Sequence, residues 1–290
     1  MRKQRFALLL AACIGASAMV GCTQQNTGGT GTSAAAGQTI SAAGTEENTE
    51  DSQPTEYTGN QQELAQMLEH FGDQEFIDAN LSQKKQQLVL LATLVSTMSY
   101  PQVKIQTGIA LDKGLTPVEI KEAIYQTASY AGYQKALNAM AYADEMFEER
   151  GIEIPIESQA TVTDEDRYEK GLAAQREIFG ENFAAITDDM SESMKRRVAY
   201  VSEFSFGDFM TRTGLDEAER ELIVMSVIAS LGGADSQLSG HTTGSLVAGN
   251  TGDELLAAVL LSMPYNGFPR GLNAYATVNE AITQYTEKNQ

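Results

Sequence analysis

Apolar residues occur along this chain in long runs and at helical spacing, and an alternating strand pattern persists nowhere. Residues 87–98 form a nearly continuous apolar run, and residues 222–231 form a second one. Both runs are too long for buried strands, so each predicts a buried helix. Residues 61–76 carry one apolar stripe that predicts a docking helix, formed by Leu64, Met67, Leu68 and Phe71. The predicted fold class is all-α.

Turn and cap signals divide the chain into further helices. Thr116-Pro117-Val118-Glu119 has the form of a capping box with proline at the first helical position. That helix should run to Tyr130, and the next from about residue 135 to residue 149. Later, a helix should open near residues 163–166 and stop at Gly180, and one or two more should lie within residues 190–211.

The chain contains an internal repeat. Tyr265-Asn266-Gly267-Phe268-Pro269-Arg270-Gly271-Leu272-Asn273-Ala274 is a second copy of the segment at residues 130–139. Shifted by 135 residues, nine of the 26 positions between Gly114 and Ala139 are identical to their counterparts. We infer a tandem duplication of one helical unit.

The N-terminal segment predicts export. Residues 1–22 have a basic start, an apolar run and a small residue before Cys22, which resembles a bacterial lipobox. The alternative is an ordinary signal peptide in which Cys22 is incidental. Residues 23–60 are polar and then acidic, which is typical of a flexible spacer. We expect an exported protein, with its folded part outside the cytoplasm, anchored to the bacterial cell membrane through a lipid on Cys22.

Charge and cysteine content exclude several functions. The net charge of −19 makes nucleic acid and anionic membrane surfaces poor partners, so the lipid should be the only membrane contact. Cys13 and Cys22 are the only cysteines, so the mature chain has no CxxC redox pair. Two histidines, His70 and His241, are too few for a multi-histidine metal centre, and we predict no metal site. His70 falls off the apolar stripe and should be solvated.

The second half carries a family pattern. Arg212-Thr213-Gly214-Leu215, Arg220, Gln237-Leu238-Ser239-Gly240-His241, Gly249, Glu254 and Tyr265-Asn266-Gly267-Phe268-Pro269 together resemble the carboxymuconolactone decarboxylase family, a relative of the alkyl hydroperoxidase D proteins. The resemblance is good over residues 166–283 and weaker over residues 81–149. We therefore divide the folded part into a degenerate first repeat, residues 61–151, and a second repeat, residues 152–290.

The resemblance implies two alkyl hydroperoxidase D-like helical units that form an internal pseudo-dimer. Because the family associates into trimers or hexamers, it also implies a homo-oligomer, such as a trimer of tandem chains.

The family has two chemistries. Its peroxidase branch resembles a CxxC pair ahead of the histidine, and this chain has Ala234-Asp235-Ser236-Gln237 there, so thiol peroxidase activity is disfavoured. The decarboxylase branch implies a lyase or lactone reaction on a small carboxylated substrate, without metal or organic cofactor. His241 would then be the catalytic general acid and base. The substrate-binding candidates are Arg212, Arg220, Gln237, Tyr265, Arg270 and Asn273.

Other interpretations remain open. His241 could be a hydrogen-bonded helix residue, Arg212 and Arg220 could serve only in salt bridges, and Tyr265 could only pack the turn. The first repeat has Gln106 where the second has His241, and Gln237 stands where the family often has Glu. The alternative function is therefore a non-catalytic module for small-anion binding or assembly on the same fold.

Overall fold

The computed structural model describes residues 59–69, 74–181, 183 and 186–290, and these residues form helices and connecting turns with no strand among them. The expectations for the signal region, for Cys22, for His70 and for nearly all of the spacer lie outside these residues. Within the described part of the chain, no helix is long and apolar enough to cross a membrane.

The helices follow the order that the repeat predicts. The first half contains α1 (Asn60–Glu69), α2 (Gln74–Asn80), α3 (Gln83–Ser96), α4 (Tyr100–Asp112), α5 (Pro117–Gln126), α6 (Ala128–Ala131) and α7 (Tyr133–Glu149). The second half contains α8 (Arg167–Phe179), α9 (Glu192–Val201), a π-helical stretch η1 (Ser202–Met210), α10 (Glu217–Leu231), α11 (Asp235–Val247), α12 (Gly252–Asn266) and α13 (Phe268–Lys288). Sequence did not predict η1, because its hydrogen-bond register leaves no signal in residue periodicity.

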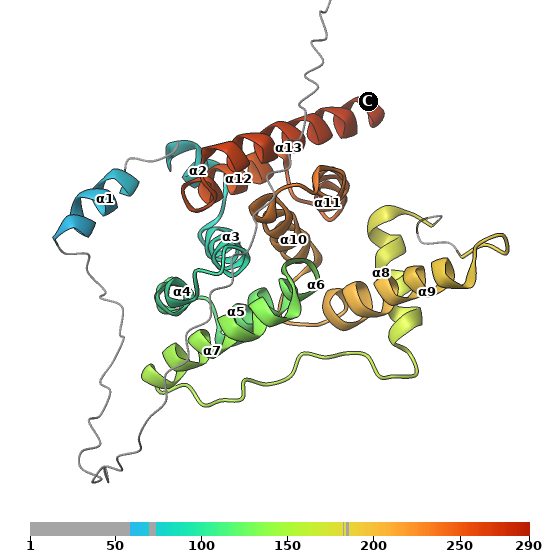
Figure 1. Ribbon diagram of the computed structural model, residues 1–290, viewed down its shortest axis with the longest axis horizontal. Helices are drawn as coiled ribbons and strands as arrows, with labels where there is room; N and C mark the ends of the chain where they lie inside the picture. The colour runs from blue at the N-terminus through green and yellow to red at the C-terminus, as the bar shows by residue number, and fades with distance from the viewer. Residues whose placement is uncertain (1–58, 70–73, 182, 184–185) are drawn as a thin grey trace, which may run out of the picture. The chain divides into compact units, whose positions relative to one another are not determined.

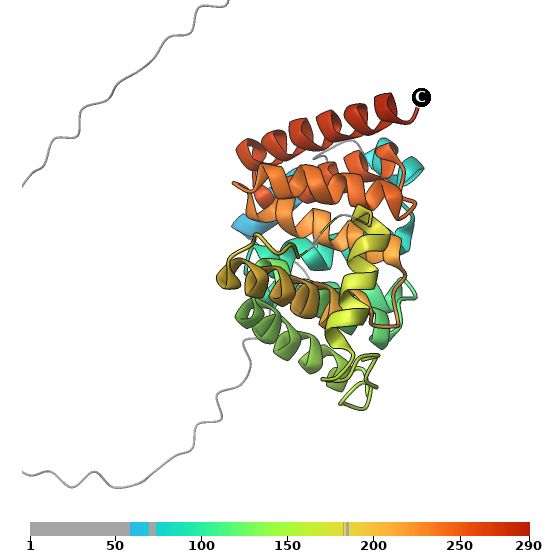
Figure 2. The same cartoon turned by 90° about the vertical axis from the view of Figure 1, so that its right-hand side faces the viewer.

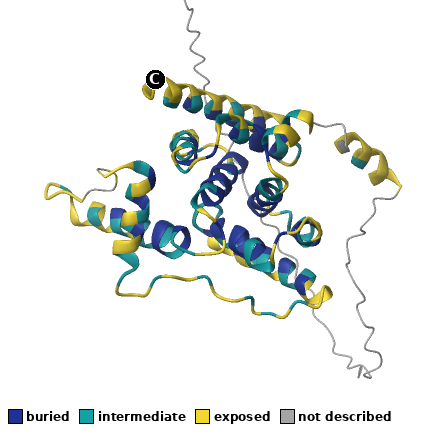
Figure 3. Ribbon diagram, turned by 180° about the vertical axis from the view of Figure 1, so that it is seen from behind, coloured by how far each residue is buried: buried dark blue, intermediate teal, exposed yellow. Residues whose placement is uncertain are grey.

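The two repeats share one interior. The long apolar runs form α3 and α10, which pack against each other in the middle of the fold, with α7 and α13 at opposite edges (Figures 1 and 2). Both central helices are largely buried (Figure 3). One hydrophobic cluster joins Leu88 and Ile124 of the first repeat to Ile223 of the second, and another joins Val89 to Leu255. The predicted all-α fold of tandem helical units is confirmed, and each core needs residues from both repeats.

Equivalent caps start equivalent helices. The Thr116 hydroxyl accepts from the Glu119 amide and the Glu119 carboxylate accepts from the Thr116 amide, as the sequence predicts. Thr251 and Glu254 form the same box on α12. Ser82 and Asp216 cap α3 and α10, which aligns these two helices at an offset of 134 residues rather than 135.

The docking role expected for residues 61–76 is not seen. Leu64, Met67 and Leu68 on α1 are 69%, 58% and 41% exposed. The apolar stripe is present, but the described residues do not cover it. Only Ile77, on the following helix α2, is buried in the core.

Close backbone contact between α8 and η1 depends on glycine. A Cβ at Gly171 would lie 2.0 Å from the Ser202 carbonyl oxygen and 2.6 Å from the Gly207 nitrogen, both rigid backbone atoms. We expect Gly171→Ala to lower the free energy of unfolding by about 1–3 kcal/mol or more, measured by urea denaturation. Gly240→Ala is the control, because a Cβ there meets no atom within 4 Å. It should be neutral or stabilise its helix by about 0.5–1 kcal/mol, and equal losses in the two variants would contradict the steric argument.

Candidate functional site

A histidine–carboxylate pair lies between α11 and α10. His241 Nδ1 is 2.9 Å from Glu221 Oε2. The Glu221 side chain is fully buried and the His241 ring is 12% exposed. The other carboxylate oxygen, Oε1, has no hydrogen-bond partner within the described part of the chain. With Glu221 at Nδ1, the opposite ring nitrogen, Nε2, remains for proton exchange.

Two aromatic rings hold the imidazole in place. The Tyr130 ring lies edge-on to His241 at a centroid distance of 4.9 Å and an angle of 87°, and the Phe179 ring lies at 5.3 Å and 90°. Tyr130 comes from α6 in the first repeat and Phe179 from α8. Burial, reinforced by the charge of Glu221, raises the pKa of Tyr130 well above its usual value. Its phenol therefore stays protonated at neutral pH and can act only as a neutral donor or acceptor.

Gly244 brings α11 close to this carboxylate. A Cβ at this position would lie 2.9 Å from Ile178 Cγ2 and 3.0 Å from Glu221 Oε2. Gly244 stands one turn after His241, so the missing side chain lets the helix approach both α8 and Glu221.

The first repeat contains a neutral counterpart of the pair. By the two offsets above, Gln87 corresponds to Glu221 and Gln106 to His241. The Gln106 amide nitrogen donates to the Gln87 side-chain oxygen at 2.6 Å, and both residues are buried. The duplicated scaffold thus holds a polar pair at both places, and only the pair of the second repeat can exchange a proton near neutral pH.

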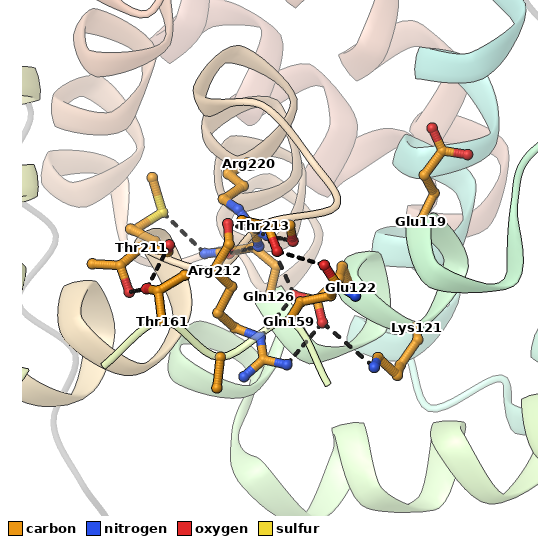
Figure 4. Close-up of polar contacts among 12 residues, drawn as sticks. Glu119, Lys121, Glu122, Gln126, Gln159, Thr161, Thr211, Arg212, Thr213 and Arg220 are labelled. Atoms are coloured by element: carbon orange, nitrogen blue, oxygen red, sulfur yellow. Dashed lines mark hydrogen bonds and ion pairs between the residues drawn. The ribbon is translucent and has the colours of Figure 1, made fainter. Parts of the chain in front are cut away.

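Arg212 and Arg220 converge on one buried carboxylate instead of on an open space (Figure 4). Arg212 Nε and Nη2 donate to the two oxygens of Glu122 at 2.7 and 2.8 Å. Arg220 Nη2 lies 3.3 Å from Glu122 Oε2, and its Nη1 donates to Gln126 Oε1 at 2.9 Å. Arg220 is 1% exposed and Glu122 is fully buried. The contacts of Arg220 correspond to the salt-bridge interpretation and leave it no surface for a substrate carboxylate.

Arg270 and Asn273 line a separate cavity. Its volume is about 480 Å³, and it lies among the end of α10, the start of α11 and the start of α13. Arg270 Nη1 donates to the Ser230 carbonyl oxygen at 2.6 Å. Lys135 makes the equivalent bond to Ser96 in the first repeat, at 3.1 Å. Part of the role of Arg270 is therefore to bind the carbonyl end of the central helix.

The remaining candidates lie near these two places. Gln237 is exposed one turn before His241 on α11, and its side-chain oxygen accepts from Ser236 Oγ at 2.9 Å. Tyr265 stands in the last turn of α12 and is 39% exposed. The candidates thus divide among the His241 pair, the Glu122 cluster and the Arg270 cavity.

Sequence reasoning missed both buried carboxylates. Glu221 directly precedes the apolar run of α10, and Glu122 stands among apolar residues of α5. A charged residue on a helix that is otherwise predicted to be buried is a usable signal, because such a charge needs a partner. Sequence could not name those partners, because His241 and Arg220 come from distant segments.

Among the described residues, no group of three or more histidine, cysteine, aspartate or glutamate side chains is placed to hold a metal ion.

Comparison with known proteins agrees with this arrangement. Residues 62–145 and 198–280 each match the carboxymuconolactone decarboxylase family, and together they cover more than half of the chain. The chain is also 29% identical, over 109 residues, to 4-carboxymuconolactone decarboxylase of Acinetobacter baylyi, a match that covers 37% of this chain and 81% of that protein. The chain therefore belongs to the carboxymuconolactone decarboxylase family.

Proposed function

We propose that this chain catalyses a decarboxylase-like lyase or lactone reaction on a small carboxylated substrate, with His241 as general acid and base and with no metal or organic cofactor. Family membership supports a decarboxylase-like activity at the level of reaction class. The observation that carries the finer proposal is the 2.9 Å contact between His241 Nδ1 and the buried carboxylate of Glu221.

The pair suits the proton step of such a reaction. Loss of CO2 from a carboxylate leaves its bonding electron pair on the adjacent carbon, and a proton must then reach that carbon. His241 Nε2–H would donate this proton, and the imidazole would regain one from solvent. Glu221 orients the ring through Nδ1 and stabilises the imidazolium form, which fits a positioning residue. Tyr130, as a neutral phenol, adds no competing charge.

Substrate binding is assigned to the side of α11 that faces solvent. Arg212 and Arg220 already neutralise Glu122, so Arg270 remains the cation best placed to attract a carboxylate. It shares its cavity with Asn273 and with Leu238, which stands one turn before His241. Gln237 and Tyr265 stay in the proposal as flanking polar contacts.

Assembly and location are part of the same proposal. Tyr133 and Leu137 on α7 are 60% and 48% exposed, and their repeat counterparts Phe268 and Leu272 on α13 are 55% and 56% exposed. Two equivalent apolar surfaces support a homo-oligomer in which each repeat meets a neighbouring chain. A monomer in light scattering at micromolar concentration would contradict this. Export and a lipid on Cys22 rest on the N-terminal pattern, and mass spectrometry of the membrane-extracted protein tests them.

The test of the reaction is CO2 release from 4-carboxymuconolactone and related lactone acids by the wild-type chain. Turnover that depends on His241 supports the proposal. No release above the level of the His241→Gln variant, with ligand binding retained, favours the alternative of a non-catalytic anion-binding or assembly module.

A further inference from the structure

A second cavity lies on the first repeat, where α5, α6 and α7 meet η1. Its volume is about 300 Å³. Tyr125, Tyr133 and Phe209 supply aromatic walls, and Leu137 and Met140 supply aliphatic ones. Two charged residues, Asp208 and Arg212, complete the lining. An apolar pocket with a few polar groups is the usual form of a small-molecule site, although this one lies at the lower end of the usual size range.

The cavity exists because the two repeats differ at two positions. Ala128 and Ala136 of the first repeat correspond to Met263 and Gly271 of the second. In the second repeat the Met263 side chain lies over Gly271, so that a Cβ on Gly271 would be only 2.5 Å from Met263 Cγ. The methionine therefore occupies this region in the second repeat. Two alanines leave it open in the first repeat.

The charge at the cavity favours an anion. The Arg212 guanidinium lies over the Tyr125 ring, 5.2 Å from its centroid. Glu122 accepts from two of its three nitrogens, Nε and Nη2, and the third makes no hydrogen bond within the described part of the chain. Glu122 also neutralises Arg220, so one carboxylate faces two guanidinium groups. Asp208 is paired with Arg167 at 2.7 Å and does not cancel this excess.

We propose that this cavity binds a small carboxylate that carries one apolar or aromatic ring. The ring lies among Tyr125, Tyr133 and Phe209, and the carboxylate points toward Arg212. The volume suits a single ring, since cavities of about 150 Å³ already admit benzene.

This site is separate from the one assigned to the reaction. Its lining contains neither His241 nor Arg270 and shares no residue with the 480 Å³ cavity. The inference therefore does not rest on the proposed function, and a binding measurement tests it without any turnover.

The test is calorimetric titration of the folded wild-type chain with benzoate, with benzamide as the uncharged ligand of the same shape. The key variant is Ala128→Met with Ala136→Gly, which copies the arrangement of the second repeat and should therefore fold. We expect benzoate to bind at least tenfold more tightly than benzamide, and the double variant to weaken benzoate binding at least tenfold with an unchanged melting temperature.

Arg270→Gln is the matched control, because it alters the other cationic cavity. It should leave benzoate binding unchanged. Equal binding by the wild type and the double variant, or loss of binding only in Arg270→Gln, would overturn the proposal. Should the double variant melt early, benzoate-induced shifts of the Tyr125 and Tyr133 ring resonances in the wild type decide instead: shifts at both rings support the site, and their absence contradicts it.

Discussion

Replacing His241 with Gln should lower kcat/KM for CO2 release by about 10²–10⁴-fold, the usual contribution of a general acid or base. Glutamine cannot exchange a proton at neutral pH, but it keeps a hydrogen bond to Glu221. The buried Gln87–Gln106 pair shows that the same scaffold accommodates a neutral pair at the equivalent place. The melting temperature should therefore change little while turnover falls.

Glu221→Gln is the companion variant. It keeps the shape of the side chain but removes the charge that stabilises the imidazolium, so turnover should fall by less than in His241→Gln. The double variant should be no slower than His241→Gln alone, because both residues act on one proton transfer. A large loss of stability in His241→Gln, with turnover per folded molecule unchanged, would show instead that the histidine is structural.

Glu122→Gln should lower the free energy of unfolding by about 3–5 kcal/mol, the usual effect of removing one partner of a buried ion pair. Glu122 is fully buried and neutralises Arg212 and Arg220, of which Arg220 is 1% exposed. The substitution keeps the side-chain volume but leaves the Arg220 guanidinium in the interior without its carboxylate. Urea denaturation of both proteins at one pH measures the loss.

The control for this prediction is Glu149→Gln. Glu149 pairs with Lys104 at 2.8 Å, but its side chain is 53% exposed, so the change should cost about 1 kcal/mol or less. Similar losses in the two variants would contradict the idea that the Glu122 cluster ties α5 to the start of α10. Replacing the pair together, as Glu122→Leu with Arg220→Met, should be less destabilising than Glu122→Leu alone, because no unpaired charge is left at Arg220.

The sequence by itself determined the helical class, the repeat and the helix boundaries. These follow from local signals: apolar runs too long for strands, and threonine–glutamate boxes that satisfy the first amides of α5 and α12. The match between residues 130–139 and 265–274 also sufficed to identify two copies of one unit. The family pattern led to His241 as the candidate acid and base.

Only the tertiary structure decided which side chains meet. The run at Glu219-Arg220-Glu221 lies on one short stretch of α10, yet Arg220 faces Glu122 of the first repeat while Glu221 faces His241. Tyr130 likewise looks structural in sequence, and the fold places it against a histidine 111 residues away. Such partners depend on how α10 is seated between the two repeats. Local periodicity predicts that a helix is buried, but it carries no information about which residue of another helix lies opposite each position.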